Sequence, residues 1–303
     1  MSAPFFSVVT PSWNQGDWIE GCIQSVLAQG SADFEHIVFD NCSTDSTASV
    51  LARHSHLITR VEKDGGQSNA LNKAFALARG EIICWLNADD QYLPGAFDIV
   101  RREFANPGVD VIFGDCEEDL CDGKPPRIRH ARFEHREDML IWWEKRTDLL
   151  QPAVFFRRSL LAEVGPLRED LHLIMDTELW WRMSERHRFH HVDAALARQQ
   201  RQPDSKTVKT VARIYEEKDR LFTPLLADAE PNRITANRRA RRDGMARRWL
   251  GLAQSALTKN RGIAKDFLWR AFRENRFVVA WPSWWKAWLL AVWPIVGAPE
   301  DFE

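Results

Sequence analysis

Two kinds of hydrophobic pattern alternate between residues 6 and 114. Short apolar runs, typical of buried strands, are separated by stretches in which apolar residues recur every three or four positions, which is helical spacing. The predicted strands cover residues 6–10, 35–40, 57–62, 81–86 and 109–114. The predicted helices cover residues 17–29, 44–54, 67–79 and 96–104. This alternation predicts an α/β fold with a mainly parallel sheet flanked by helices.

The pattern changes in the second half of the chain. The elements predicted there are a strand at residues 151–156 and helices at residues 160–164 and 176–186. From Lys209 onward almost the whole chain has helical spacing. We therefore divide the chain into an α/β domain, residues 1–207, and a helical C-terminal extension, residues 208–303.

The composition narrows the function classes. The net charge of −2 gives no signature of a protein that binds nucleic acid. The five cysteines are odd in number and lack a partner set of cysteine and histidine residues for a metal, so a reduced, cytosolic compartment fits them best. The N-terminus has no basic region before an apolar segment, so we expect no signal peptide. The sequence thus predicts a cytoplasmic protein without nucleic-acid partners.

Polar and acidic residues follow the predicted strands. In a parallel sheet the carboxyl ends of the strands meet at one edge, where ligands bind. These ends carry residues 10–14, 40–41, 63–66 and 87–90. Asp89 and Asp90 come directly after an apolar strand, where two carboxylates are costly unless a cation meets them. A hard divalent cation that carries a diphosphate would do so, and the alternative is that Asp90 caps a helix.

The phosphate-binding loops of two common nucleotide-binding folds are missing from the sequence. No Gly-x-Gly-x-x-Gly follows the first strand, and no Gly-Lys-Ser or Gly-Lys-Thr occurs in the chain. The backbone cradles that hold phosphate in dinucleotide-binding and P-loop proteins are therefore absent from the sequence, which argues against both classes.

Six segments, taken in their order and spacing, resemble a known family. They are residues 8–14, 39–47, 64–73, 85–96, 151–157 and 176–182. Through them the chain resembles family 2 of the inverting glycosyltransferases, which has the Rossmann-like GT-A fold, between residues 5 and 207. The third and fourth segments resemble a bacterial subgroup that builds exopolysaccharide or lipopolysaccharide glycans.

The resemblance implies a metal ligand and a base. Asp89 would bind Mg²⁺ or Mn²⁺ bridging the diphosphate of the donor, and Asn87 takes the first place of the family's Asp-x-Asp motif. Asp176 would take the proton of the acceptor hydroxyl, and Glu178 is the alternative base. Outside the resemblance, Asp176 could serve only as a helix N-cap.

The same resemblance places the nucleotide sugar. Asp40 or Asn41 would hydrogen-bond the nucleobase, while the alternative role of Asp40 is to cap a turn. The other residues expected around the nucleotide sugar are Pro11, Ser12, Trp13, Asn14, Asp64, Gln67, Asn72, Asn87 and Asp90. Trp13 is expected to stack on the nucleobase, and the alternative is that its ring packs in the hydrophobic core.

The implied reaction is a single displacement that inverts the anomeric carbon. The donor would be a UDP-, dTDP- or GDP-sugar, and the acceptor a hydroxyl of a glycan or a lipid-linked glycan in cell-surface polysaccharide biosynthesis. The alternative is a catalytically silent nucleotide-sugar-binding or assembly subunit. The chain departs from the family at Gln202, where related sequences often carry a histidine near the metal; His190 and His191 are candidates to replace it.

The C-terminal extension combines basic and tryptophan-rich segments. Residues 233–248 are dense in arginine, and residues 277–294 contain five tryptophans with Lys286 as their one charged residue. The apolar helix expected there has about eleven residues, too few for the ~20 that a membrane-spanning helix needs. We expect a helix that contacts an anionic membrane surface, with packing on its own domain or on a dimer partner as the alternatives.

Overall fold

The computed structural model describes residues 3–30, 33–144, 147–200, 210–227, 231–257 and 260–292. The chain forms two compact units, one of residues 1–139 and 146–217 and the other of residues 140–145 and 218–303. The predicted boundary between residues 207 and 208 lies outside the described residues.

The first unit begins with four parallel strands, as predicted. β1 (Phe6–Ser12) pairs with β2 (Phe34–Asp40) on one side and β4 (Ile82–Trp85) on the other, and β3 (Leu57–Val61) pairs with β2. β1 runs past its predicted end to Ser12. Pro11 is tolerated there because β4 pairs with β1 only as far as Val9, so Pro11 has a strand neighbour on one side.

Beyond β4 the sheet is mixed. β8 (Val154–Arg157) lies antiparallel between β4 and β6 (Val111–Asp119), and β9 (Phe189–Gln200) runs parallel to β6. The edge strands β5 (Gln91–Tyr92) and β7 (Arg127–Arg129) pair antiparallel with β9 and β6. The sequence predicted β8, which a short 3-10 turn η3 (Gln151–Ala153) precedes, but missed β5, β7 and β9. The pattern of a single strand carries no information about the direction of its partners.

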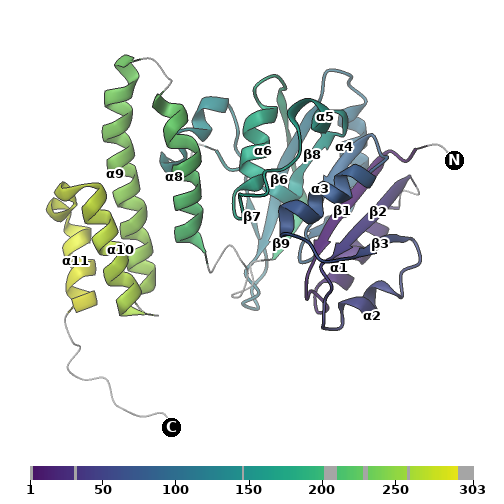
Figure 1. Ribbon diagram of the computed structural model, residues 1–303, viewed down its shortest axis with the longest axis horizontal. Coiled ribbons are helices and arrows are strands. Elements are labelled where there is room, and N and C mark those ends of the chain that lie inside the picture. The colour runs from purple at the N-terminus through teal and green to yellow at the C-terminus, as the bar shows by residue number, and fades with distance from the viewer. Residues whose placement is uncertain are drawn as a thin grey trace, which may run out of the picture. The chain divides into compact units, whose positions relative to one another are not determined.

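Helices cover the sheet and bury their periodic apolar residues. These helices are α1 (Ile19–Leu27), α2 (Thr47–Leu51), α3 (Gln67–Leu77), α4 (Ala96–Phe104), α5 (Ser159–Val164) and α6 (Met175–Met183). Figure 1 shows α3 lying against β1 and β2. Phe97 of α4 stacks on Phe6 of β1 at 4.2 Å between ring centroids, and both are fully buried. Each such side chain contributes about 1.5–3 kcal/mol of burial free energy.

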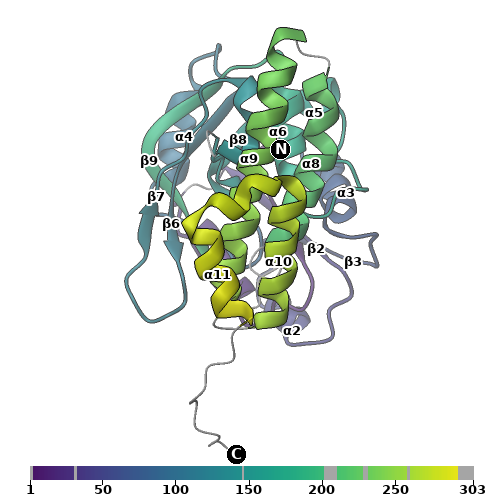
Figure 2. The same cartoon turned by 90° about the vertical axis from the view of Figure 1, so that its left-hand side faces the viewer.

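The second unit is helical, which confirms the prediction for the C-terminal extension. It contains the end of α8 (Val211–Ala227), α9 (Pro231–Ala256), α10 (Arg261–Glu274), the 3-10 turn η4 (Arg276–Ala280) and α11 (Pro282–Val292). Figures 1 and 2 both show α9, α10 and α11 side by side. No helix in the described part of the chain is both long and apolar enough to cross a membrane.

A short segment from the middle of the chain belongs to the helical unit. Trp142 and Trp143, in the 3-10 turn η2 (Trp142–Glu144), are buried there. A Cβ at Gly244 of α9 would come within 2.2 Å of the Trp143 ring, so only glycine lets the helix approach this closely. Arg248 donates to the Trp142 carbonyl at 3.0 Å. The chain therefore enters the helical unit twice.

Candidate active site

A cavity of about 800 Å³ opens at the carboxyl ends of β1, β2 and β4 in the first unit. This volume is typical of a pocket that binds a small molecule or a cofactor. The predicted site residues that line it are Pro11, Ser12, Trp13, Asn14, Asn41, Asp64, Gln67, Asn87, Asp89, Asp90 and Asp176. The predicted residues Asp40, Asn72 and Glu178 are not among the lining residues. The cavity thus brings together predicted site residues up to 165 positions apart, from Pro11 to Asp176.

Asn87 is the centre of a hydrogen-bond network at the end of β4. Its Oδ1 accepts from Gln67 Nε2 and from Trp85 Nε1, each at 3.0 Å. Its Nδ2 donates to Gln151 Oε1 at 2.8 Å and to Asp90 Oδ2 at 3.3 Å. Gln151 is held in turn, because its Nε2 donates to the Trp85 carbonyl at 2.6 Å. The amide of Asn87 is therefore engaged at both ends and organises the turn that follows β4.

Asp89 and Asp90 differ in their surroundings. Asp90 is buried, and its Oδ1 accepts from the Gln200 backbone N–H at 3.3 Å. Asp89 is half-buried, and its carboxylate forms no hydrogen bond or ion pair with another described residue. Burial raises the pKa of Asp89 above its ordinary value because the charged form loses hydration. Asp89 is thus the carboxylate of this turn whose charge a cation would best compensate.

The donor set fits a cation that brings most of its own ligands. In the described part of the chain, no three His, Cys, Asp or Glu side chains gather closely enough to hold a metal. A protein cage for zinc or calcium is therefore not present among these residues. Mg²⁺ and Mn²⁺ are commonly held by one or two carboxylates together with substrate phosphates and water, and Asp89 suits that mode.

The turn after β1 is held by the turn after β2. Asn14 has a positive φ of 52°, a conformation that asparagine tolerates better than most residues. Its backbone N–H donates to Ser43 Oγ at 2.8 Å, and its Oδ1 accepts from the Thr44 backbone N–H at 2.9 Å. Ser43 Oγ donates to Asp40 Oδ1 at 2.5 Å. Asp40, 1% exposed, therefore supports Asn14 through Ser43, in line with the turn-capping alternative for this residue.

The ends of β2 and β3 are joined in the same way. Asn41 Oδ1 accepts from the Asp64 backbone N–H at 3.1 Å, and Asp64 Oδ1 accepts from the Gly66 N–H at 2.8 Å. Gly66 has a φ of 118°, which L-residues with a side chain rarely adopt, and it places Gln67 at the start of α3. Trp13 lines the same cavity and is 62% exposed, so it is not a core residue.

Asp176 stands in the first turn of α6, with its side chain on the cavity. Its Oδ1 accepts from the Thr177 backbone N–H at 2.6 Å and from Thr177 Oγ1 at 3.3 Å. The loop before it contributes His172 and Leu173 to the cavity wall. Glu217 of α8 accepts from the backbone N–H groups of both, at 3.4 and 3.0 Å. Thr177 thus holds the carboxylate of Asp176, and Glu217 holds the neighbouring backbone of the cavity wall.

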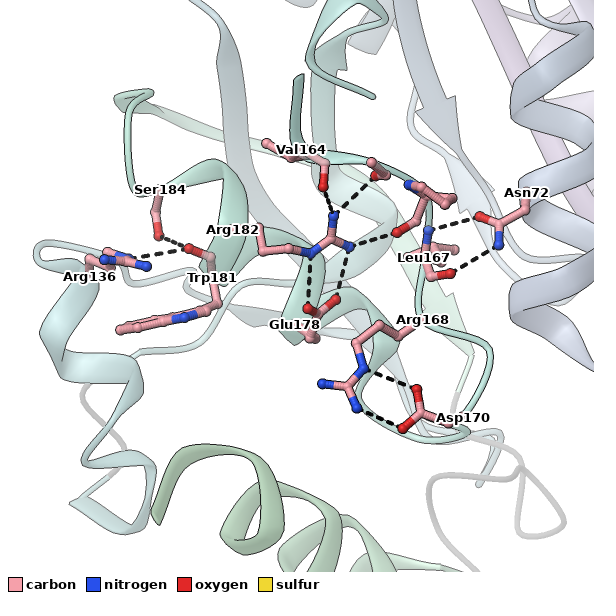
Figure 3. Close-up of polar contacts among 12 residues, drawn as sticks. Asn72, Arg136, Val164, Leu167, Arg168, Asp170, Glu178, Trp181, Arg182 and Ser184 are labelled. Carbon is pink, nitrogen blue, oxygen red and sulfur yellow. Dashed lines mark hydrogen bonds and ion pairs between the residues drawn. The ribbon is translucent and has the colours of Figure 1, made fainter. Parts of the chain in front are cut away.

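Glu178 and Asn72 tie α6 and α3 to the loop that follows α5 (Figure 3). Both oxygens of Glu178 accept from Arg182, at 2.9 Å each. Arg182 also donates to three consecutive backbone carbonyls of that loop, those of residues 164–166. Asn72 donates to the Leu167 carbonyl at 3.0 Å and accepts from its N–H at 2.8 Å. Asn72 directly, and Glu178 through Arg182, therefore hold the loop that follows α5.

Replacing Arg182 by lysine should lower the free energy of unfolding by about 2–4 kcal/mol, because lysine cannot reproduce the fork and leaves carbonyls without donors. Urea denaturation of the purified variant measures this change. Arg168→Lys is the matched control (Figure 3). Arg168 also forms a bidentate pair, with Asp170, but 46% of its side chain is exposed. A change of about 0.5 kcal/mol or less is expected there, and equal losses in both variants would contradict the role given to Arg182.

Several cavity residues were not singled out from the sequence. Gln151, Gln199 and Gln200 line the cavity together with His172 and Ile214. Gln151 offered one signal, since it opens a segment that resembles the family, whereas Gln199 and Gln200 end a strand that the sequence did not reveal. Gln202, where a histidine was expected, lies outside the described residues.

His190 and His191, the two histidines considered as metal ligands, do not line the cavity. His190 Nε2 lies 3.3 Å from Glu103, and His191 Nε2 lies 3.7 Å from Asp115. Both belong to the beginning of β9, whereas the cavity is lined by the end of that strand, at Gln199 and Gln200.

Comparison with known proteins agrees with this geometry. The family model described as Glycosyl transferase family 2 matches residues 7–165. An uncharacterized protein of Mycobacterium tuberculosis (strain CDC 1551 / Oshkosh) is 30% identical over 251 residues, which cover 76% of this chain and 79% of that protein. A PGL/p-HBAD biosynthesis glycosyltransferase of Mycobacterium bovis (strain BCG / Pasteur 1173P2) is 29% identical over 185 residues, 58% of this chain and 68% of the relative.

A solved structure shares the fold. The mannosyltransferase PcManGT from Pyrobaculum calidifontis, solved in complex with GDP-Man and Mn²⁺, superposes with a TM-score of 0.55 and is 18% identical. The match covers 96% of this chain and 85% of that one. Together with the family match over more than half of the chain, these findings confirm the resemblance seen in the sequence. The chain belongs to glycosyl transferase family 2 and is a glycosyltransferase with a GT-A fold and a helical C-terminal extension.

Proposed function

We propose that this glycosyltransferase is metal-dependent and inverting, and that it moves a sugar from a nucleoside-diphosphate donor to a hydroxyl of a glycan or lipid-linked acceptor. The observation that carries the proposal is that Asp89 and Asp176 line one cavity. The first is a half-buried carboxylate with a raised pKa, and the second stands at the start of a helix. A cation site and a base on the same cavity are the two parts that such a transfer needs.

The nucleotide part of the donor is proposed to lie over the ends of the first three strands. Trp13 offers an exposed ring for stacking, and Pro11 and Ser12 continue the wall beside it. Asn14, Asn41, Asp64 and Gln67 offer polar groups for the nucleobase and the ribose or sugar hydroxyls. Asp40 and Asn72, which lie outside the lining, support this wall through Ser43 and Leu167.

The diphosphate is proposed to lie next to Asp89 with Mg²⁺ or Mn²⁺. The metal, when bound, supplies Lewis-acid stabilisation of the leaving nucleoside diphosphate. Asp89 would be its protein ligand, and Asn87 holds the turn because its amide is already engaged. The Mn²⁺ in the PcManGT structure supports this assignment for a protein of the same fold.

Asp176 is proposed to remove the proton of the acceptor hydroxyl as that oxygen attacks the anomeric carbon. Its contacts with Thr177 keep the carboxylate oriented while it accepts the proton. One displacement of this kind inverts the anomeric configuration and requires no covalent intermediate. The alternative of a catalytically silent subunit is less favoured, because such a subunit has no need of a base on the cavity.

We infer that the acceptor belongs to the cell surface. The relative named for PGL/p-HBAD biosynthesis supports a glycolipid or glycan acceptor of this kind. A cytoplasmic location is part of the same proposal. All five cysteines are free, which suits a reducing compartment.

A thermal-shift screen of UDP-, dTDP- and GDP-sugars, each with and without Mn²⁺, tests the proposed donor class. A ligand at 100 times its Kd stabilises the folded state by about 2.7 kcal/mol, and one donor should therefore raise Tm by about 5–10 °C only when Mn²⁺ is present. The free sugar with Mn²⁺ is the control and should leave Tm unchanged. No shift with any nucleotide sugar would contradict the proposed donor.

A further inference from the structure

α11 carries large apolar side chains on its exposed side as well as on its buried side. Trp284, Ala287 and Ala291 are buried within the helical unit. On the other side Trp285 is 47% exposed and Leu289 is 46% exposed, and these two residues share a face because they are four positions apart. Apolar side chains on both sides of a helix normally lie in an apolar environment, which the described part of this chain supplies to α11 on one side only.

Other large apolar side chains extend this exposed surface in sequence. Phe277 of η4, which leads into α11, is 78% exposed. Trp288 contacts Trp285 edge to face at 5.6 Å between ring centroids. Figure 2 shows α10 and α11 in front of α9, at one face of the helical unit. Surface apolar residues gathered on one helix and its leading turn indicate a contact that the isolated chain does not make.

The helical unit is strongly basic, while the rest of the chain is acidic. Residues 218–303 contain sixteen lysines and arginines and nine acidic residues, whereas residues 1–217 contain twenty-five and thirty-four. This asymmetry is hidden in the overall charge of −2. Charge separated in this way along a chain indicates an anionic partner for the basic part.

The four acidic side chains described between residues 218 and 292 each bond a partner in the helical unit. Asp219 and Glu274 both pair with Arg241, Asp266 pairs with Arg270, and Asp243 accepts from Asn275.

Basic side chains stand exposed around the apolar surface. Arg273 and Arg276 stand exposed just before α11, and Lys286 stands exposed on it. The exposed surface of η4 and α11 thus combines aromatic and aliphatic side chains with positive charge.

We propose that η4 and the exposed face of α11 bind the interface of an anionic lipid bilayer. Trp285, Leu289 and Phe277 would enter the boundary between headgroups and acyl chains, and Lys286 and Arg276 would contact lipid phosphates. α11 has eleven residues, about 16 Å, so it lies in the plane of the membrane and does not span its ~30 Å hydrocarbon core. A second copy is a poorer occupant, because two basic units would repel each other.

Co-sedimentation of the full chain with phosphatidylcholine vesicles that contain 30% phosphatidylglycerol tests the proposal. The unchanged protein should pellet with these vesicles and not with pure phosphatidylcholine. The double variant Trp285→Ser/Leu289→Ser should bind at least about tenfold more weakly. The variant Arg273→Gln/Arg276→Gln/Lys286→Gln should also bind more weakly, and raising the salt should release the unchanged protein.

Val61→Ser/Ile128→Ser is the matched control, since it removes two exposed apolar side chains of the first unit, and it should pellet like the unchanged protein. Thermal unfolding shows whether each variant is folded, and sugar transfer to a water-soluble acceptor should be unaffected by the α11 changes. Equal pelleting of the α11 variant and the control, or no pelleting of any, would overturn the proposal. Light scattering that shows an oligomer dissociated by the α11 changes, without vesicle binding, would assign the face to a second copy.

Discussion

Asp176→Asn should lower kcat for sugar transfer by about 10²–10⁴-fold, the usual contribution of a positioned base. The amide cannot take the acceptor proton, yet its oxygen can still accept from Thr177, so the helix start and the cavity should keep their shape. The donor should therefore bind as before. Single-turnover transfer measures the chemical step, and a donor-induced rise in Tm with Mn²⁺ reports binding.

Glu178→Gln separates the two candidate bases. Both oxygens of Glu178 accept from Arg182 in a largely buried pair, so this variant should lose stability while the folded fraction keeps its kcat. The opposite pattern, an inactive but stable Glu178→Gln and an active Asp176→Asn, would transfer the role of base to Glu178.

Asp89→Asn should abolish the dependence on Mn²⁺ and lower kcat/KM by about 10³-fold. The loss corresponds to several kcal/mol of stabilisation of the leaving diphosphate. The variant should also lose the extra rise in Tm that Mn²⁺ gives with the donor. Metal titrations of transfer activity and of Tm measure both effects.

Protons should compete with the metal at Asp89. Its pKa is raised by burial, so the Mn²⁺ concentration for half-saturation should begin to rise at a higher pH than for an ordinary aspartate as the solution is acidified. Asp122→Asn is the control, because this carboxylate pairs with Lys124 away from the cavity and its loss should leave the titration unchanged. An Asp89→Asn enzyme that still requires Mn²⁺ at the same concentration would rule out this ligand.

The predicted site came from a simple rule about parallel sheets. The ends of the first four strands were expected to meet, and Asn14, Asn41, Asp64 and Asp89 do line one cavity. That rule depends only on the order of strands and helices, which hydrophobic spacing reveals. The resemblance to the family added Asp176, which no local rule connects with these strands. Their chemical roles stay predictions until the variants are measured.

The rule could not tell which polar residues face the cavity and which hold its walls. Asp40, Asn72 and Glu178 are polar residues in matched segments, yet each bonds the scaffold in the structure. The position of Asn72 depends on Leu167, 95 positions away, and that of Glu178 depends on Arg182, which donates to carbonyls of residues 164–166. Gln151 was missed for the same reason, since its role depends on contacts with Trp85 and Asn87 more than sixty positions away.

The sequence by itself determined the alternating elements, the helical extension and the polar strand ends, because these follow from local periodicity and from strand order. Tertiary structure alone decided that β8 runs antiparallel and that Trp143 packs against Gly244 of α9. It also decided that the side-chain amide of Asn87 is engaged in a hydrogen-bond network, while the carboxylate of Asp89 stays available to bind a cation. Each of these features depends on which groups distant in the sequence pair with a strand edge, pack against a ring or bond a polar atom. Local sequence patterns do not specify those partners.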